Sequence, residues 1–552
     1  MKRFLSLVLV ACTLHCSAQE NVGGLPYSFR HAPLGGAPST VVASPFDASA
    51  VAANDAERER AGELPLYARF RTVERGLHNA GAWTELPNGD RVWRLRVESP
   101  GALATELFFA NFHLPPGGIM HVYNDDGSHV LGGFTTYNNH PSGLFTTEGI
   151  NGDASIIEYF EPLAVRGQGS FTISHVGHAY RFVGGTKADA CEVDVVCVPE
   201  GSGWSEERDG VVRISVVSSL GTGWCSGSLV NNTAQDCKPY FLTAFHCGET
   251  STTANFNQYK FYFRYQRSGC ASGTALANKV MTGCARRADS NCGGGDNGSD
   301  FLLVEANNNV PANFFPYFNG WDASGTGSNS GVGIHHPSGD EKKISTYTGA
   351  LVSATWWNAN GAHWRVFWTA TTNGWGVTEP GSSGSPIFNA SGRIVGTLTG
   401  GGSCCTVNGC GNGTGPTVQD LYGKMSYHWG SQNPNPANEE LHVWLDPGNS
   451  VDVLDGSSNP CGIYSVQEES LEAPGLYPNP ATNSVTVVFP NASARAELLI
   501  VVDMAGRVVL DPVSVATGKA EINVSGLANG AYLVKLMADG VAYAAAPLHV
   551  AH

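Results

Sequence analysis

Three polar side chains, far apart in the chain, have the types that acyl-transfer chemistry requires. Ser383 lies in a loop of small residues, GSSGSP at 381–386, where two glycines let backbone N–H groups converge. His246 ends the apolar run YFLTAF, and Asp300 stands directly before the run FLLV. Serine loses its proton as it attacks a carbonyl carbon, so it needs a neighbouring base such as histidine. A carboxylate that orients the histidine would complete such a site.

Each of these residues also has a purely structural interpretation. Loops such as 381–386 are common as flexible turns. His246 could be a core histidine packed under a disulfide, and Asp300 could cap a strand or bind a cation beside the GGG run at 293–295. We favour the catalytic interpretation because the chain order His, Asp, Ser is one of the known orders of the catalytic triad.

The surrounding motifs resemble those of chymotrypsin-like serine proteases, which carry T-A-x-H-C and G-x-S-G-x-P. A closer resemblance, to the bacterial lysyl endopeptidases, extends from about residue 191 to 456. It is carried by DVVC at 194–197, SLVNNTA at 228–234, YFLTA at 240–244, IHHP at 334–337 and VTEPGSSGSP at 377–386. The resemblance implies a serine endopeptidase, made as a precursor, that cleaves proteins and peptides after Lys, or after Lys and Arg, through an acyl-enzyme.

The same resemblance implies a mainly β fold with a trypsin-like double six-stranded β-barrel. His246 and Asp300 would come from the first barrel and Ser383 from the second. Backbone N–H groups of Gly381 and Ser383 would form the oxyanion hole. Ser382 stands where the trypsin pattern has an acid. We therefore expect activation to depend on removal of an inhibitory pro-region, and the exact N-terminus of the catalytic unit to matter little.

The resemblance also suggests how a substrate is chosen. Asp420, in the segment QDLYG, matches the family's carboxylate at the base of the primary pocket. A desolvated carboxylate there would select a Lys or Arg side chain that neutralises it. Asp420 could instead be an acid in a surface turn.

In the family, a histidine and a tryptophan shape the same pocket. The matching residues here are Thr399 and Trp356, with Trp357 as a second match. Because the histidine is missing, the choice between Lys and Arg stays open. The strand at 393–399, with Gly400 and Gly401, is expected to pair with the substrate backbone, as an added strand does.

The composition indicates several mainly β domains. A chain of 552 residues exceeds the size of one hydrophobic core, and its 68 glycines with short alternating runs favour strands. The net charge of −16 argues against a nucleic-acid partner. No later run is apolar over the roughly 20 residues that a membrane span requires. We expect a monomer without a cofactor or metal ion, although calcium binding stays open.

The N-terminus has the pattern of a secretion signal, with Lys2 and Arg3 before an apolar run and small residues at 17–18. A lipoprotein signal ending at Cys12 is the alternative. The β-like segment that follows contains no cysteine before Cys191, which suits a disposable pro-region as well as a permanent binding domain. The domain prediction is a signal peptide at 1–18, a pro-region at 19–187, a trypsin-like serine protease domain at 188–460, a linker at 461–473 and a sorting β-sandwich at 474–552.

The junction between the pro-region and the protease domain is small and polar, GGTKADA at 184–190. Cleavage after Lys187 would suit self-processing by a lysine-directed enzyme, so we predict a mature N-terminus at Ala188. The last domain resembles the C-terminal sorting domain of the type IX secretion system, which implies export across the outer membrane to the medium or cell surface. An accessory substrate-binding sandwich is the alternative, because the chain does not end in the family's basic residues.

Fourteen cysteines are present, and two of them fall in the signal. An even number in a secreted chain favours disulfides. The resemblance implies the pairs Cys191–Cys405, Cys197–Cys270 and Cys225–Cys247. The last would close a loop of about 20 residues and stabilise the fold by about 3 kcal/mol. Six cysteines have no assigned partner, with Cys284–Cys292 as a suggestion: Cys237, Cys284, Cys292, Cys404, Cys410 and Cys461.

Two other features have alternative interpretations. His335 and His336 could suggest a metal site, but adjacent residues of a strand point to opposite faces, so a structural role is favoured. A cell-surface adhesin or other binding protein on a protease-like scaffold is the rival from a different functional class. A serine endopeptidase with another primary specificity is the rival within the same class.

Overall fold

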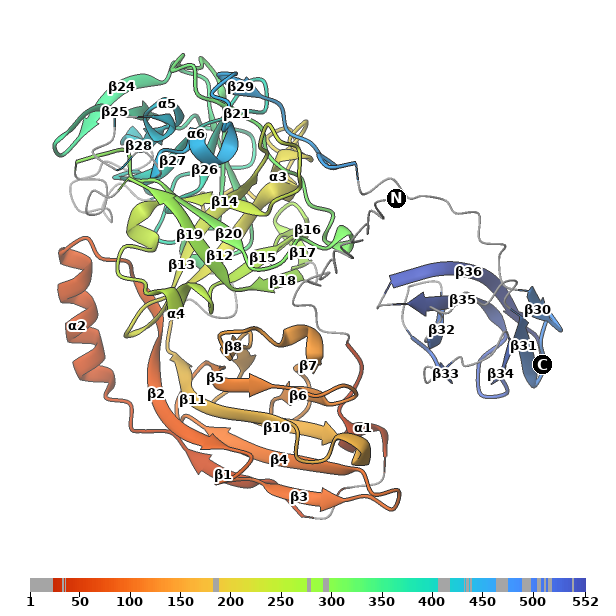
Figure 1. Ribbon diagram of the computed structural model, residues 1–552. Coiled ribbons are helices and arrows are strands. Elements are labelled where there is room, and N and C mark those ends of the chain that lie inside the picture. Colours follow the sequence, from red (N-terminus) through yellow and green to blue (C-terminus); the bar gives the residue numbers. More distant parts are fainter. Residues whose placement is uncertain are drawn as a thin grey trace, which may run out of the picture. The chain divides into compact units, whose positions relative to one another are not determined.

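Figure 1 shows the computed structural model of the chain. The residues it describes are 23–31, 34, 36–181, 188–275, 279–290, 297–405, 417–430, 432, 436, 439–462, 475–488, 498–503, 508–510, 513–514, 519–538 and 541–552. They form two compact units, 1–462 and 463–552. The predicted signal peptide lies outside the described residues.

The first part of the larger unit is a β-sandwich, which we call the N-terminal sandwich (residues 39–179). One sheet has the order β1-β4-β10-β6-β7 with β3 on β4, and the other contributes β2-β11-β5-β8 with β9 on β5. The elements are α1 (Tyr27–Arg30), β1 (Ser39–Val42), α2 (Ala48–Arg60), β2 (Leu66–Gly76), β3 (Ala82–Glu85), β4 (Arg91–Glu98), β5 (Ala104–His113), β6 (Ile119–Tyr123), β7 (Val130–Phe134), η1 (Thr136–Asn138), β8 (Phe145–Thr146), β9 (Ile150–Asn151), β10 (Ala154–Glu161), η2 (Leu163–Val165) and β11 (Ser170–Ala179).

The core of this sandwich is aromatic and follows from strand alternation. Trp93, Leu95 and Val97 on β4 are fully buried, while Arg94 and Arg96 between them are partly exposed. This is the period of two that a half-buried strand requires. The buried face packs against side chains of the opposite sheet, so the sandwich has a core of its own.

The next part contains the sheet that leads to His246 and Asp300. Its strand path is β18-β15-β12-β13, continued by β14, β20 and β19, and β13 also pairs with β2 of the N-terminal sandwich. The elements are α3 (Glu207–Gly210), β12 (Val211–Val217), β13 (Gly221–Val230), β14 (Tyr240–Thr243), η3 (Phe245–Cys247), α4 (Thr253–Phe256), β15 (Lys260–Phe263), β16 (Arg267–Gly269), β17 (Ser272–Ala275), β18 (Lys279–Thr282), β19 (Cys284–Asp289), β20 (Leu302–Ala306) and η4 (Ala312–Phe314).

Strand β15 differs from its expected half-buried pattern. The alternation of Phe261 and Phe263 with Tyr262 predicts one solvent-exposed face. Every residue of β15 is nevertheless buried. Phe261 stacks on Phe241 at 4.4 Å inside the sheet's own core, and Tyr262 packs edge-on against Trp224. The face of β15 that carries Tyr262 is shielded from solvent because the N-terminal sandwich covers it.

The last part of the larger unit is a second antiparallel sheet, of order β23-β22-β26-β27-β28-β25-β24, with β21 between β27 and β29. Its elements are β21 (Trp321–Asp322), β22 (Gly331–His335), η5 (Pro337–Gly339), β23 (Lys343–Tyr347), β24 (Val352–Trp356), β25 (Ala359–Val366), β26 (Pro386–Asn389), β27 (Ile394–Gly401), β28 (Asp420–Lys424), α5 (Met425–Trp429), α6 (His442–Leu445) and β29 (Val453–Leu454).

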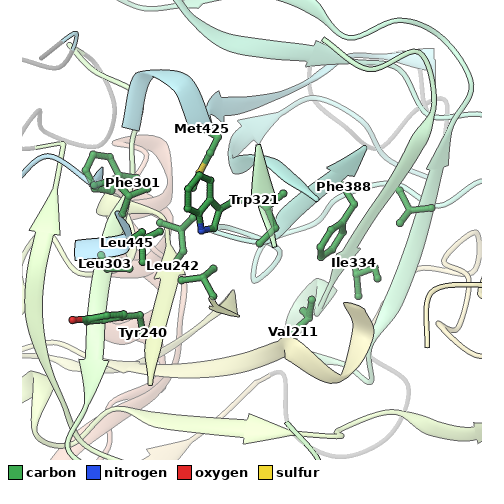
Figure 2. Packing of buried hydrophobic residues seen from close by; sticks show 14 of the residues in the cluster. Val211, Tyr240, Leu242, Phe301, Leu303, Trp321, Ile334, Phe388, Met425 and Leu445 are labelled. Carbon is green, nitrogen blue, oxygen red and sulfur yellow. The ribbon is translucent and has the colours of Figure 1, made fainter. Parts of the chain in front are cut away.

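A shared hydrophobic core joins this second sheet to the sheet that leads to His246 and Asp300 (Figure 2). Leu242 and Leu303 come from the first sheet, and Trp321, Ile334 and Phe388 from the second. All five side chains are buried. The ends of β14, β20 and β26 are thereby held relative to one another, and these are the ends that carry the three predicted catalytic residues.

The smaller unit is a separate β-sandwich with sheets β30-β31-β34 and β33-β32-β35-β36. The alternation of Val485, Val487 and Phe489 predicts one buried face, and Val485 and Val487 are buried. Phe489 and the turn that the sequence predicts at 504–507 lie outside the described residues. Its strands are β30 (Gly475–Tyr477), β31 (Ser484–Val488), β32 (Leu498–Asp503), β33 (Val513–Ser514), β34 (Lys519–Asn523), β35 (Gly530–Ala538) and β36 (Val541–Val550). None of the helices in the described parts of the chain is long and apolar enough to cross a membrane.

Candidate active site

His246 and Asp300 are brought together by strand pairing. His246 lies in η3, directly after β14, and Asp300 directly precedes β20. These strands are antiparallel, with Thr243 opposite Leu302, so the two residues meet at one edge. His246 Nδ1 lies 2.8 Å from Asp300 Oδ2, and the His246 backbone N–H donates to Oδ1 at 3.0 Å.

The carboxylate changes the basicity of the imidazole. Burial alone would lower the pKa of His246, but the charge of the fully buried Asp300 and the hydrogen bond to it outweigh burial and raise that pKa. Asp300 has a φ of +56°, a left-handed conformation that Asp tolerates better than most residues. The carboxylate thus favours the protonated form of the imidazole.

The loop that carries Ser383 lies against the segment before His246. The Ser383 carbonyl accepts a hydrogen bond from Ser226 N at 2.8 Å. Gly384 has a φ of +78°, and a Cβ added there would lie 2.1 Å from Thr243 Oγ1 and 2.6 Å from Ala244 N. Only glycine allows this close approach, which brings Ser383 alongside the histidine segment.

The same loop presents two backbone donors. Within the part of the chain that the structure describes, the N–H groups of Gly381 and Ser383 donate to no other protein group. Gly381 has a φ of +97°. Ser382, between them, is buried, and its hydroxyl binds His335 Nδ1 at 2.8 Å and accepts from Glu379 N at 3.2 Å. The hydroxyl of Ser382 thus anchors the loop between these two N–H groups.

The two adjacent histidines bind different protein groups. His335 also binds Ser345 Oγ through Nε2 at 2.9 Å, while His336 donates from Nδ1 to the Asp340 carbonyl at 2.9 Å. Burial lowers the pKa of both rings, that of His335 to about 3. These contacts support the structural interpretation of the pair.

Asp420 is a fully buried carboxylate at the start of β28. It accepts hydrogen bonds from Trp368 Nε1 at 2.6 Å, Thr378 Oγ1 at 2.9 Å, Ser403 Oγ at 2.5 Å and Ser403 N at 3.1 Å. Burial raises its pKa, and these donors act in the opposite direction. No Lys or Arg of the described residues pairs with it. The surface-turn interpretation of Asp420 is wrong, because the side chain is inside the second sheet.

The predicted pocket wall lies beside this acid. A Cβ added at Gly401 would be 1.9 Å from Asp420 Oδ1, and one added at Gly400 would be 3.3 Å from the Trp356 ring. Trp357 is instead 74% exposed. Trp356 is therefore the tryptophan that lies against Gly400.

Only the end of the predicted substrate-binding strand has a free edge. Strand β27 pairs with β28 up to Gly401, but with β26 only from Ile394 to Thr397. The residues before Leu398 are therefore paired on both sides. Among the described residues of this strand, a substrate strand could therefore add at Thr399, Gly400 and Gly401.

Sequence reasoning missed His363, which lies on β25. Its ring is fully buried, and Nε2 lies 3.0 Å from Thr399 Oγ1. The ring centroid is 6.2 Å from that of Trp356, and burial lowers its pKa to about 4. A histidine thus stands beside Thr399 although Thr399 itself replaces the family's histidine. A lone histidine in an alternating strand gives no sequence signal for this position.

The structure contains the three disulfides implied by the resemblance, Cys191–Cys405, Cys197–Cys270 and Cys225–Cys247. A fourth joins Cys237 to Cys461 across 224 positions. Cys404 is also disulfide-bonded. Cys284 is a buried free thiol, so the suggested pair with Cys292, which lies outside the described residues, is wrong.

Two parts of the chain match known protein families. Residues 185–423 match the family described as "Lysyl endopeptidase, C-terminal domain", and residues 475–545 match "Secretion system C-terminal sorting domain". The protein is a lysyl endopeptidase-like serine endopeptidase. Its sorting domain marks the protease as exported, to the outside or the surface of the cell.

Individual relatives are distant. The protease is 29% identical to a lysyl endopeptidase of Pseudomonas aeruginosa over 348 residues, 58% of this chain and 71% of that protein. It is 25% identical to the secreted RxLR effector protein 73 of Plasmopara viticola over 317 residues, 54% of this chain and 74% of that one. Among solved structures, the protease Anisep of Arthrobacter nicotinovorans is 17% identical, with a TM-score of 0.29, over 40% of this chain and 92% of that chain.

Proposed function

We propose that the protease hydrolyses proteins on the carboxyl side of Lys, with His246, Asp300 and Ser383 as its catalytic triad. The observation that carries the proposal is the 2.8 Å contact between His246 Nδ1 and Asp300 Oδ2, beside the Ser383 loop. Because Nδ1 faces the carboxylate, Nε2 is the nitrogen left for the serine hydroxyl. That is the tautomer a general base needs.

The reaction would follow two half-steps. Ser383 Oγ attacks the carbonyl carbon of the scissile bond while His246 Nε2 takes its proton, and the resulting oxyanion accepts hydrogen bonds from Gly381 N and Ser383 N. His246 then gives the proton to the leaving amine, which departs and leaves an acyl group on Ser383. Water, activated by His246, hydrolyses this acyl-enzyme and restores the serine.

The preference for Lys would come from Asp420. Its carboxylate is buried with four neutral hydrogen bonds, and no Lys or Arg among the described residues pairs with it. A substrate ammonium that enters the pocket would supply the missing positive charge, whereas a neutral side chain would leave the carboxylate uncompensated. Thr399, Gly400, Gly401 and Trp356 would form the wall of this pocket. Protein and peptide substrates follow from this chemistry, and we propose a monomer.

We also propose that the protease is made as a precursor. Residues 19–187 would be the pro-region and 188–460 the catalytic unit, joined by the linker at 461–473 to the sorting domain at 474–552. Cleavage between Lys187 and Ala188 would separate the first two. N-terminal sequencing of the mature protein checks this, and a terminus far from Ala188 would contradict self-cleavage after Lys.

Two measurements test the function. An organofluorophosphate should label the mature protease at Ser383 and should fail to label the Ser383→Ala variant; no labelling of intact protein would favour the binding-protein alternative. Mass spectrometry of fragments from one denatured substrate should then show new C-termini at Lys. Fragments without a basic C-terminus would support a serine endopeptidase of another specificity.

A further inference from the structure

The lysines of the larger unit differ from its arginines in number and in place. Between residues 19 and 462, lysine stands at Lys187 of the junction and at six further positions. The structure describes all six: Lys238, Lys260, Lys279, Lys342, Lys343 and Lys424. Residues 19–186 contain eleven arginines and no lysine. A protease that cuts after Lys is itself a substrate for its own activity, so the place of each lysine matters.

Four of the six lysines are buried. Lys260 and Lys342 are fully buried, and Lys343 and Lys424 are 4% and 8% exposed, although lysine is almost never buried unless it is paired. Each Nζ is bound inside the protein: Lys260 lies 3.3 Å from Glu106 Oε1, Lys342 2.5 Å from the Arg208 carbonyl, Lys343 2.6 Å from Asp194 Oδ1 and Lys424 2.7 Å from Ser353 Oγ. The protease cannot reach these side chains unless the fold opens.

The two other lysines are protected in different ways. The side chain of Lys238 is 51% exposed, but Pro239 follows it. The nitrogen of that bond belongs to the proline ring, which also restricts the backbone of the residue before it, so the bond fits an active site poorly. Lys279 is partly buried and begins β18, where it and the next residue pair with β15. The bond after Lys279 therefore lies inside a strand pair.

Several arginines lie where a protease can reach them. Four arginines of the N-terminal segment are exposed: Arg30, Arg60, Arg75 and Arg166. Arg60 ends α2 and is followed by the exposed residues 61–63, and Arg166 is followed by the exposed residues 167–168. Exposed turns of this kind are where proteases cut folded proteins. An enzyme that accepted Arg would therefore cut its own precursor at these positions.

The hydrogen bonds of Asp420 favour an ammonium over a guanidinium. Its Oδ2 accepts from Trp368 Nε1, Thr378 Oγ1 and Ser403 Oγ, whereas among the described residues Oδ1 accepts from Ser403 N alone. An arginine binds a carboxylate best through two parallel hydrogen bonds, one to each oxygen. A lysine ammonium is a point charge that needs only one oxygen. Because Oδ2 already has three donors, the proposed pocket suits Lys better than Arg.

We propose that the protease resists its own activity, because its pocket excludes arginine and because the folded chain of residues 19–462 contains no lysine bond that it can cut other than Lys187–Ala188. The inference rests on the proposed cleavage after Lys and on the proposed role of Asp420. Exposed arginines then keep positive charge on the surface without creating cleavage sites. Self-processing of the larger unit is thereby confined to one bond.

The full-length Ser383→Ala chain, which cannot cut itself, is the substrate that tests this inference. Mature protease made from the unchanged precursor is added to it, and the cuts are mapped by mass spectrometry and N-terminal sequencing. In the folded chain, we expect one cut within residues 19–462, after Lys187. In the reduced and alkylated chain, which stays unfolded, cuts should also follow Lys279 and the four buried lysines. The Lys238–Pro239 bond and the bonds after arginines should stay intact in both forms.

The outcomes separate this inference from the proposed function. A cut after Arg60 or Arg166 in the folded chain would overturn the exclusion of arginine, and a cut after a second lysine there would overturn the self-resistance. In both cases the protein would still be a protease directed to basic residues. Absence of cuts in both forms of the chain, or cuts after neutral residues, would instead contradict the proposed function, and the inference with it.

Arg60→Lys tests whether the choice of arginine protects the fold. Arg60 is exposed, and its Nε donates to the Ala56 carbonyl at 3.0 Å, a contact within one helix that the sandwich can lose without unfolding. In the inactive chain, we expect the added protease to cut after residue 60 in Arg60→Lys at least about tenfold faster than in the matched control Arg60→Gln or in the chain with Arg60. Equal rates at this position in all three chains would overturn the inference.

Discussion

At the scale of single residues, the basicity of His246 is set by one contact. Asp300 raises the pKa of His246 against the effect of burial. The imidazole accepts a proton only when it is neutral, so kcat/KM should rise as pH increases through this raised pKa. The acid limb of the pH profile thus reports on Asp300.

Asp300→Asn should change both the rate and this limb. We expect kcat to fall by about 10⁴, because the amide no longer holds the correct tautomer. The remaining activity should have its acid limb at lower pH, since the carboxylate that raised the pKa of His246 is gone. Measurement of kcat/KM against pH checks this. An acid limb that stays in place would mean that Asp300 does not contact His246 in the working enzyme.

Asp420→Asn tests the pocket while preserving the shape of the side chain. For a Lys substrate, kcat/KM should fall by a factor on the order of 10² or more, because the ammonium loses its only carboxylate partner. For a substrate with Leu in place of Lys, it should not fall. The organofluorophosphate labelling rate of Ser383 should be nearly unchanged, which shows that the fold survives. An unchanged Lys-to-Leu ratio would remove Asp420 from its proposed role.

At the scale of secondary-structure elements, much of the site could be predicted from the sequence. His246 follows one buried strand and Asp300 precedes another, so antiparallel pairing of β14 with β20 was enough to join them. Residues without a local motif were missed. His363 reaches Thr399 only through the pairing of β25 with β28 and of β28 with β27. Long-range contacts of this kind leave no pattern in one sequence.

The approach of the Ser383 loop to β14 gives a prediction at this scale. Gly384→Ala adds a methyl group 2.1 Å from Thr243 Oγ1 in a left-handed backbone conformation. The loop should move away from His246, lowering kcat by about 10² or more and stability by about 1–3 kcal/mol. Kinetics and chemical denaturation measure the two effects.

Gly361→Ala is the matched control for this change. Gly361 has a similar φ of +69°, but an added Cβ would lie 3.6 Å from its nearest neighbour, Ser353 Oγ. This variant should therefore carry the backbone strain without the clash, and its kcat should stay close to that of the wild type. Equal losses of activity in both variants would mean that strain, not the approach to β14, explains the effect of Gly384→Ala.

At the scale of the whole larger unit, the N-terminal sandwich is built into the catalytic part. Strand β2 extends the first catalytic sheet by pairing Arg69 with Gly221 of β13. Tyr67 stacks on Trp224 at 4.1 Å. Trp224 lies two residues before Ser226, whose N–H donates to the Ser383 carbonyl. This explains why β13 and β15 are buried on both faces, which their sequences do not indicate.

A buried ion pair lies at the centre of this contact. Glu106 of the sandwich and Lys260 of β15 are both almost completely buried, with Oε1 and Nζ 3.3 Å apart. Tyr67 donates to the same carboxylate oxygen at 2.6 Å, and Thr222 Oγ1 donates to the other at 3.2 Å. Burial lowers the pKa of Lys260, while Glu106 acts in the opposite direction. Loss of the carboxylate would leave an uncompensated ammonium inside the protein.

Glu106→Gln should therefore destabilise the precursor strongly. In the inactive Ser383→Ala background, which prevents self-cleavage, we expect the free energy of unfolding to fall by about 3–5 kcal/mol. Combining Glu106→Gln with Lys260→Met removes the unpaired ammonium and should restore much of the lost stability. Glu85→Gln, which breaks an exposed pair with Arg166 in the same sandwich, should cost at most about 1 kcal/mol. Urea denaturation of the full chain gives all four values, and a double variant no more stable than Glu106→Gln would show that Lys260 is not the group that Glu106 neutralises.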